Sequence, residues 1–145
     1  SNDALTTAKE NAFINGFEKK IEFVQADVFD YLPQVESLKP APYDFIILDP
    51  PAFTKSRKTA LDAVRGYTEI NSRAMKALPR GGYLATCSCS HFMEEKMFVK
   101  MLKNASEYAG VSLRLIKACA QSPDHPELMS VPETKYLKFY LLQIT

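Results

Sequence analysis

The sequence lacks several features that mark particular classes of protein. It has no run of about 18 apolar residues, so no membrane-spanning helix is expected. Residues 1–3 have neither the basic start nor the apolar stretch of a secretory signal peptide. The three cysteines, Cys87, Cys89 and Cys119, are too few and too unevenly spaced for a disulfide framework. These absences predict a protein of the reducing cytoplasm with no membrane partner.

The chain also has little net charge and few glycines. Its formal net charge is +1 at pH 7, whereas proteins that grip a nucleic-acid backbone usually carry a basic excess. If RNA is the substrate, most of the phosphate-binding charge is expected outside this chain. The five glycines include no G-x-G pattern, so the Gly-rich loop of a nucleotide-binding fold is not recognisable.

What the sequence does contain is the pattern of one α/β domain. Its 145 residues are 46% hydrophobic and 24% charged, which suits a single globular domain. Alternating helices and strands predict a mostly parallel sheet with right-handed crossovers, and the helix-free last connection permits an antiparallel last strand. The expected helices lie near residues 4–13, 28–35, 61–78 and 92–108, and the expected strands lie at 21–25, 43–48, 83–87, 111–118 and 136–144.

Polar side chains follow the first three expected strands, where ligands bind in open α/β sheets. They are Asp27, Asp49 and Cys89, in that order. Asp49 precedes Pro50 and Pro51, which remove two backbone donors and fix two φ angles, so the chain leaves the sheet in a set direction. A rigid turn without function is the alternative for this segment, and Asp27 is equally well explained as the N-cap of the next helix.

The two neighbouring thiols differ in their expected environment. Cys87 lies within the strand and is expected to be a small buried residue. Cys89 stands one step further out, where Ser90 can cap the following helix and the helix dipole stabilises a thiolate. Cys89 is therefore predicted to be functional. No metal is expected at Cys87, Cys89 and His91, because ligands alternating along one strand, without a second Cys or His pair, make a poor tetrahedral site.

Together these motifs resemble a known family of enzymes. Asp49-Pro50-Pro51-Ala52-Phe53 is similar to the fourth motif of class I methyltransferases. The ordered set resembles the bacterial large-subunit ribosomal RNA cytosine-C5 methyltransferases that carry an amino-terminal PUA domain, over essentially the whole chain. The other members of the set are Arg65-Gly66-Tyr67, Asn71, Ser88-Cys89-Ser90, Asp124-His125-Pro126 and Tyr136-Leu137-Lys138.

The resemblance implies a Rossmann-like class I methyltransferase sheet that lacks its first strands and its Gly-rich loop. Residues 1–145 are then expected to form a single partial catalytic domain, without the amino-terminal third of the fold and without the RNA-binding PUA domain. Strand edges left unpaired in such a fragment favour a homodimer or a strand-exchanged oligomer.

The resemblance also implies roles for individual residues. Asp27 and Val28 would contact the adenine of the cofactor S-adenosylmethionine, and Asp49 and Pro50 would line its pocket. Cys89 would add to carbon 6 of a cytosine in ribosomal RNA, while Asp49 would hold the edge of that base. The remaining residues expected to contact the substrate are Pro51, Phe53, Lys55 and Arg65.

Two other functions remain open. A related RNA methyltransferase that acts on a base nitrogen shares the Asp-Pro-Pro motif but needs no covalent thiol, so Cys89 discriminates between the two. A non-catalytic fragment or binding module is the second alternative, and the unrecognised Gly-rich loop favours it for this chain.

Overall fold

The computed structural model describes residues 2–53 and 60–145, and the chain divides into two compact units, residues 1–31 and 32–145. The first unit opens with α1 (Asn2–Ile14), as predicted. Gly16 ends this helix at φ 71°, where N–H groups of Gly16 and Phe17 donate to the carbonyls of Phe13 (3.0 Å) and Ala12 (2.8 Å). This pair of bonds is a Schellman cap, which requires the left-handed conformation that glycine adopts without strain.

The strand expected at residues 21–25 is wrong. Residues 21–27 have no regular structure, and Ile21 and Val24 are 44% and 48% exposed. A strand is stable only when its N–H and C=O groups pair with a neighbour, and none of the strands in the described residues pairs with this segment. The chain runs instead into α2 (Val28–Ser37), which begins in the first unit and ends in the second.

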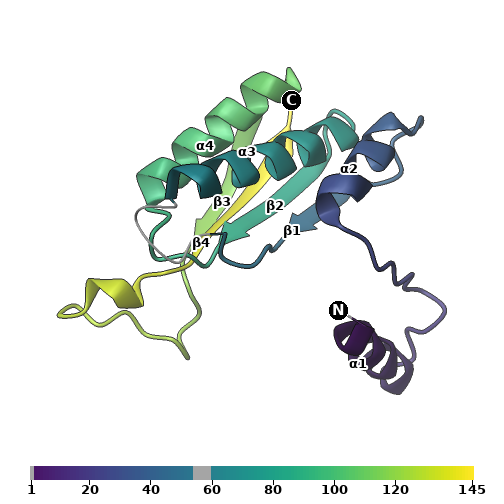
Figure 1. The fold of residues 1–145 in the computed structure, drawn as a ribbon, viewed down its shortest axis with the longest axis horizontal. Helices are drawn as coiled ribbons and strands as arrows, with labels where there is room; N and C mark the ends of the chain where they lie inside the picture. Colours follow the sequence, from purple (N-terminus) through teal and green to yellow (C-terminus); the bar gives the residue numbers. More distant parts are fainter. Residues whose placement is uncertain (1, 54–59) are drawn as a thin grey trace. The chain divides into compact units, whose positions relative to one another are not determined.

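The second unit is built on a four-stranded sheet in the order β1-β2-β4-β3. Its strands are β1 (Phe45–Leu48), β2 (Tyr83–Ser88), β3 (Leu113–Cys119) and β4 (Lys138–Ile144). β1 is parallel to β2, and β4 is antiparallel to both β2 and β3, so only the last strand runs against the others. The expected α/β sheet with an antiparallel last strand is confirmed, and β4 lies inside the sheet (Figure 1).

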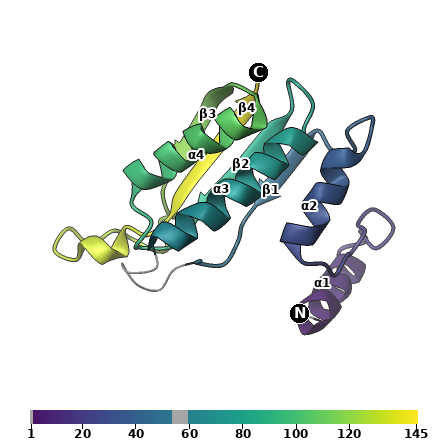
Figure 2. The same cartoon turned by 45° about the horizontal axis from the view of Figure 1, so that its top comes forward.

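Two long helices, α3 (Ala60–Ala77) and α4 (Glu95–Ala109), lie side by side over one face of this sheet (Figures 1 and 2). On α3 the apolar residues Ile70, Ala74 and Ala77 follow helical spacing and are buried, as the 3.6-residue period requires. The sheet contributes Leu84 and Ile144 to the same core. No helix in the described ranges is both long and apolar enough to cross a membrane.

The start of α4 and the connection before β4 differ from what the sequence predicts. α4 begins at Glu95 rather than near Phe92, and Ser90 does not cap it. Residues 90–93 form a turn in which the N–H of Met93 donates to the carbonyl of Ser90 at 3.1 Å. The long connection before β4, for which no helix is predicted, contains one turn of 3-10 helix at Pro132–Thr134.

Candidate active site

The carboxyl ends of β1 and β2 bring a carboxylate and a thiol together at one edge of the sheet. Leu48 is opposite Thr86 in the parallel register, so the next residues, Asp49 and Cys87, are neighbours. The Cys87 thiol donates to Oδ1 of Asp49 at 3.1 Å and also lies 3.4 Å from the carbonyl oxygen of Leu48. The Asp-Pro-Pro segment and the segment that carries Cys89 therefore meet where the sequence places a site.

Cys87 is in a poor environment for a nucleophile. Its side chain is buried, and burial raises the pKa of the Cys87 thiol to about 12, with the hydrogen bond to Asp49 and the charge of Asp49 acting in the same direction. At neutral pH it is therefore a protonated, inaccessible hydrogen-bond donor to Asp49.

Cys89 has the opposite environment. It is exposed, while Ser88 and Ser90 on either side of it are buried. The N–H of Ser90 donates to the hydroxyl of Ser88 at 3.3 Å, so the backbone on both sides of the thiol is anchored. α4 starts only at Glu95 and has Glu94 as its N-cap, so the cap predicted at Ser90, next to Cys89, is wrong.

Tyr67 connects the elements of this edge through a buried phenol. The hydroxyl of Ser88 donates to the hydroxyl of Tyr67 at 3.0 Å, and the Tyr67 ring lies 4.6 Å from the ring of Phe53, centroid to centroid. Desolvation raises the pKa of Tyr67, which stays a neutral phenol. Tyr67 thus joins α3 to the end of the Asp-Pro-Pro segment and to β2. The sequence pattern assigns it no role, although it belongs to the motif Arg65-Gly66-Tyr67.

Lys138 is the second residue whose place the sequence analysis misses. It opens β4, its side chain is only 7% exposed, and its ammonium donates to the carbonyl of Ser90 at 2.5 Å. A lysine at the start of an otherwise apolar strand is the signal that identifies it, because lysine is rarely buried without partners.

The cofactor residues expected from the resemblance are divided between the two units. Asp27 and Val28 lie in the first unit. Oδ1 of Asp27 accepts a hydrogen bond from the N–H of Phe29 at 2.8 Å, so the alternative prediction for Asp27, the N-cap of the next helix, is confirmed. Asp49 and Pro50 lie in the second unit, with Asp49 exposed.

The two residues predicted to contact RNA phosphates, Lys55 and Arg65, are not brought to the edge that carries Cys89 in the part of the chain that the structure describes. Arg65 is exposed on α3, lies 3.8 Å from Asp62, and lines a groove between α3 and α4 rather than the edge that carries Cys89. Lys55 lies outside the described residues. Pro51 and Phe53 follow Asp49 directly, and Phe53 packs on Tyr67.

In residues 2–53 and 60–145, no group of three or more His, Cys, Asp and Glu side chains is arranged to hold a metal ion.

Two curated relatives match nearly the whole chain. Ribosomal RNA large subunit methyltransferase I of Aeromonas hydrophila is 40% identical over 95% of this chain and 35% of its own length. The protein of the same name from Vibrio vulnificus is 38% identical over 99% of this chain and 37% of its own length. This chain therefore spans little more than a third of the relatives it matches. No protein-family profile matches it.

Solved structures share the fold at lower identity. A protein assigned as a methyltransferase and solved in complex with SAH superposes with a TM-score of 0.67 at 19% identity, over 81% of this chain and 30% of its own chain. A protein from Streptococcus mutans, assigned as an S-adenosylmethionine-dependent methyltransferase, superposes with the same TM-score of 0.67 at 21% identity, over 83% of this chain and 30% of its own. The sheet with its antiparallel last strand is thus a methyltransferase-type α/β fold.

Proposed function

We propose that this chain is part of an S-adenosylmethionine-dependent methyltransferase that methylates carbon 5 of a cytosine in ribosomal RNA. The observation that carries the proposal is the exposed thiol of Cys89 at the carboxyl edge of β2, one strand away from Asp49. Relatives named as ribosomal RNA methyltransferases, matched over 95% and 99% of the chain, support the substrate class. Such a substrate implies work in the cytoplasm. We also propose that residues 1–145 belong to one partial catalytic domain whose missing strands and PUA domain lie elsewhere in the protein.

The chemistry of the residues fits the cofactor. Asp27 is exposed and follows no strand, and an exposed carboxylate is a suitable acceptor for the amino group of adenine, with the half-buried Val28 beside the ring. For Asp49 and Pro50 we propose a role in lining the cofactor pocket. When bound, S-adenosylmethionine supplies an electrophilic methyl group from its sulfonium sulfur.

The chain's own residues supply the activation of the base. Carbon 5 of cytosine is not electron-rich enough to attack a methyl group unaided, so a nucleophile is needed. The Cys89 thiolate adds to carbon 6, a carbon–sulfur bond forms, and the electron pair of the 5,6 double bond becomes available at carbon 5. Asp49 holds the edge of the cytosine and stabilises the charge that develops there. After methylation a base removes the proton from carbon 5, and the carbon–sulfur bond breaks to release the thiolate.

The substrate must also be delivered to the thiol. A paired or stacked cytosine has to swing out of the RNA helix to reach Cys89. Pro51 and Phe53, which follow Asp49, are the side chains proposed to meet that base. Lys55 and Arg65 are proposed to contact RNA phosphates, and the net charge of +1 assigns most of that binding to the remainder of the protein.

The test is carried out on the whole protein that contains this chain. Cys89→Ala is expected to abolish methyl transfer to ribosomal RNA and to leave S-adenosylmethionine affinity nearly unchanged. Cys87→Ala is expected to keep activity and to lower the free energy of unfolding by about 1 to 3 kcal/mol, as a modest core truncation does. RNA that carries 5-fluorocytosine at the target should trap a covalent adduct with the parent and with Cys87→Ala, but not with Cys89→Ala.

Two results would change the conclusion. If Cys89→Ala methylated RNA at nearly the parental rate, the thiol mechanism would be excluded and methylation of a base nitrogen would replace it. If the whole protein transferred no methyl group to any RNA, the chain would belong to a binding module.

A further inference from the structure

We propose that Lys138 is a positioning residue for Cys89, whose ammonium group clamps the segment that carries the thiol and stabilises the thiolate. The inference rests on the proposed function, because it concerns the thiol to which that function assigns the attack on cytosine. It concerns a step that precedes methyl transfer, namely holding an accessible cysteine in place. It can therefore be tested on Cys89 without RNA or cofactor.

The register of the sheet places Lys138 beside the segment that carries the thiol. β4 is antiparallel to β2, and Lys138 is paired with Ser88, the residue before Cys89. The Lys138 ammonium donates to the carbonyl of Ser90, the residue after Cys89, at 2.5 Å. Lys138 thus contacts the chain on both sides of Cys89 and joins it to a central strand.

A second hydrogen bond fixes the ammonium itself. Its nitrogen also donates to the carbonyl of Tyr136 at 2.7 Å. An ammonium group has three donors, and these two backbone carbonyls use two of them. Neither carbonyl carries a full charge, so the buried positive charge is held by dipoles and is left to act on its neighbours.

The charges around Lys138 identify the neighbour on which it acts. Burial lowers the pKa of Lys138 to about 8, while the negative charges of Cys89 and Glu95 oppose that change, so the side chain is mostly protonated at neutral pH. Glu95 already accepts a hydrogen bond from the hydroxyl of Tyr140 at 2.9 Å. Cys89 is the other acidic group whose charge acts on this ammonium.

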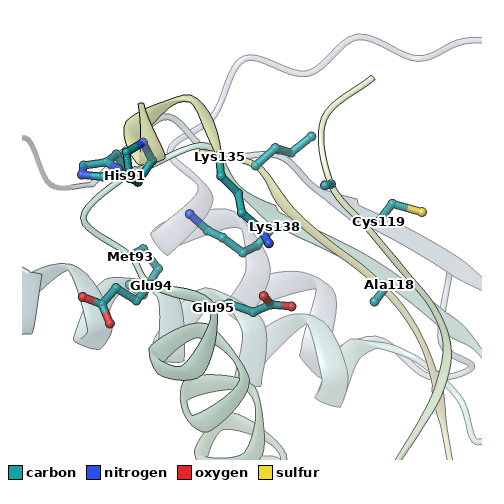
Figure 3. A pocket seen from close by; sticks show the side chains of 11 residues that line it. His91, Met93, Glu94, Glu95, Ala118, Cys119, Lys135 and Lys138 are labelled. Carbon is teal, nitrogen blue, oxygen red and sulfur yellow. The ribbon is translucent and has the colours of Figure 1, made fainter. Parts of the chain in front are cut away.

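The surrounding pocket contains other titratable groups, which any pH measurement must take into account. A pocket of about 450 Å³ is lined by Lys138 and Glu95 together with His91, Glu94 and Lys135 (Figure 3). Lys135 is exposed and has the same formal charge, so it is a matched control for the electrostatic effect of the pocket as a whole.

Lys138 also supplies what the start of α4 does not. A thiolate near a helix amino terminus is stabilised by backbone N–H groups, but α4 begins at Glu95. If Ser90 were the N-cap, its carbonyl would point into the helix. Instead this carbonyl accepts hydrogen bonds from the ammonium of Lys138 and from the N–H of Met93. In this fold the positive charge near Cys89 is a side chain from another strand.

The experiment measures alkylation of each cysteine by iodoacetamide between pH 6 and 9 in the full chain, with peptide mass spectrometry separating Cys89 from Cys87. In Lys138→Met and Lys138→Gln we expect the rate at Cys89 at pH 7 to fall about threefold or more and its pH profile to move to higher pH, because the thiolate loses a nearby positive charge. Lys138→Arg, which keeps the charge, should restore most of the parental rate. Lys135→Met should leave the profile unchanged.

The variants separate charge from packing. Lys138→Gln keeps an NH2 group with two donors, on a side chain one bond shorter, and loses the charge. It is the variant compared with the parent if Lys138→Met does not melt cooperatively. Either of two results would overturn the proposal. One is a folded Lys138→Gln chain with the parental pH profile of Cys89 alkylation, and the other is a Lys135→Met chain whose profile moves as far as that of Lys138→Met. If the Lys138 variants changed the alkylation of Cys89 as expected but the whole protein formed no 5-fluorocytosine adduct, the proposed function alone would be contradicted.

Discussion

Two cysteines separated by a single serine have opposite chemistry because a β-strand ends between them. Cys87 is still in the ladder of β2, buried and bonded to Asp49, whereas Cys89 is past the last paired residue and exposed. The hydrogen bond from Cys87 also has a consequence for Asp49, since it occupies one oxygen of that carboxylate. Cys87 is therefore a neutral hydrogen-bond donor to Asp49 and not a nucleophile.

The elevated pKa of Cys87 makes a prediction about stability at alkaline pH. The thiol has an ordinary pKa of 9.0 in the unfolded chain and about 12 in the folded one. Its folded pKa is raised, so its contribution to stability is fully present below pH 9 and is lost as pH rises from 9 toward 12. Between pH 9 and 10 the parent should lose about 1 kcal/mol more of its free energy of unfolding than Cys87→Ala.

Urea unfolding at pH 8, 9 and 10 measures this difference. Lys138 has a lowered pKa and acts in the opposite direction over this range, but it is present in both proteins and cancels in the comparison. Tyr140, whose pKa is raised to about 12, cancels in the same way. Parallel pH dependences for the parent and Cys87→Ala would show that the Cys87 thiol titrates normally in the folded chain.

At the scale of elements, the sequence predicts the helices and strands whose apolar residues are spaced by burial in the core. Continuous apolar runs predict β1 and β2, and the stripe of Ile70, Ala74 and Ala77 predicts α3, because each has its partners within the second unit. The connection before β4, for which no helix is predicted, permits the antiparallel direction that β4 has. The start of α4 is missed because Ser90 resembles an N-cap, whereas its carbonyl is engaged by Lys138 from another strand.

The failed strand at 21–25 shows the limit of such reasoning. Ile21 to Val24 has the composition of a strand, yet a strand exists only when another lies beside it. Local sequence cannot say whether that neighbour is present. The roles of Tyr67 and Lys138 are missed for the same reason, since each depends on a residue far away along the chain, Ser88 for Tyr67 and Ser90 for Lys138.

β1 carries a prediction about self-association. Its partner in the sheet is β2, and the sheet in the described part of the chain has β1 at its end, with Phe45 and Ile47 48% and 67% exposed. An apolar edge strand is a template for pairing with a second copy. We therefore expect the chain to form homodimers or strand-exchanged oligomers, which size-exclusion chromatography with light scattering measures.

A charge on the edge strand should weaken this association, as it does in natural sheets that avoid aggregation. Ile47→Lys is expected to shift the chain toward the monomer. Met129→Lys adds the same charge at a residue that is 93% exposed outside the sheet and should leave the distribution unchanged. A parent chain that is monomeric at every concentration and melts cooperatively would refute the prediction.

At the scale of the whole molecule, the chain divides the proposed cofactor residues between its two units and holds few of the groups that bind a nucleotide. Asp27 and Val28 belong to the first unit, and Asp49 and Pro50 belong to the second. The chain also spans 35% and 37% of the two relatives described above. We therefore expect the proposed cofactor binding to depend on contacts that these residues alone do not make.

The last prediction is that this chain by itself binds S-adenosylmethionine weakly or not at all. A cofactor of this kind is normally cradled by the backbone amides and tight turn of a Gly-rich loop at a helix start, and none of the five glycines belongs to a G-x-G pattern. Isothermal titration calorimetry should show no saturable heat for S-adenosylmethionine or SAH at micromolar concentration. The methyltransferase solved with SAH, whose matched part is 30% of its chain, is the positive control under the same conditions. A micromolar dissociation constant for this chain, lost in Asp49→Ala, would show that Asp49 and its neighbours hold the cofactor without a Gly-rich loop.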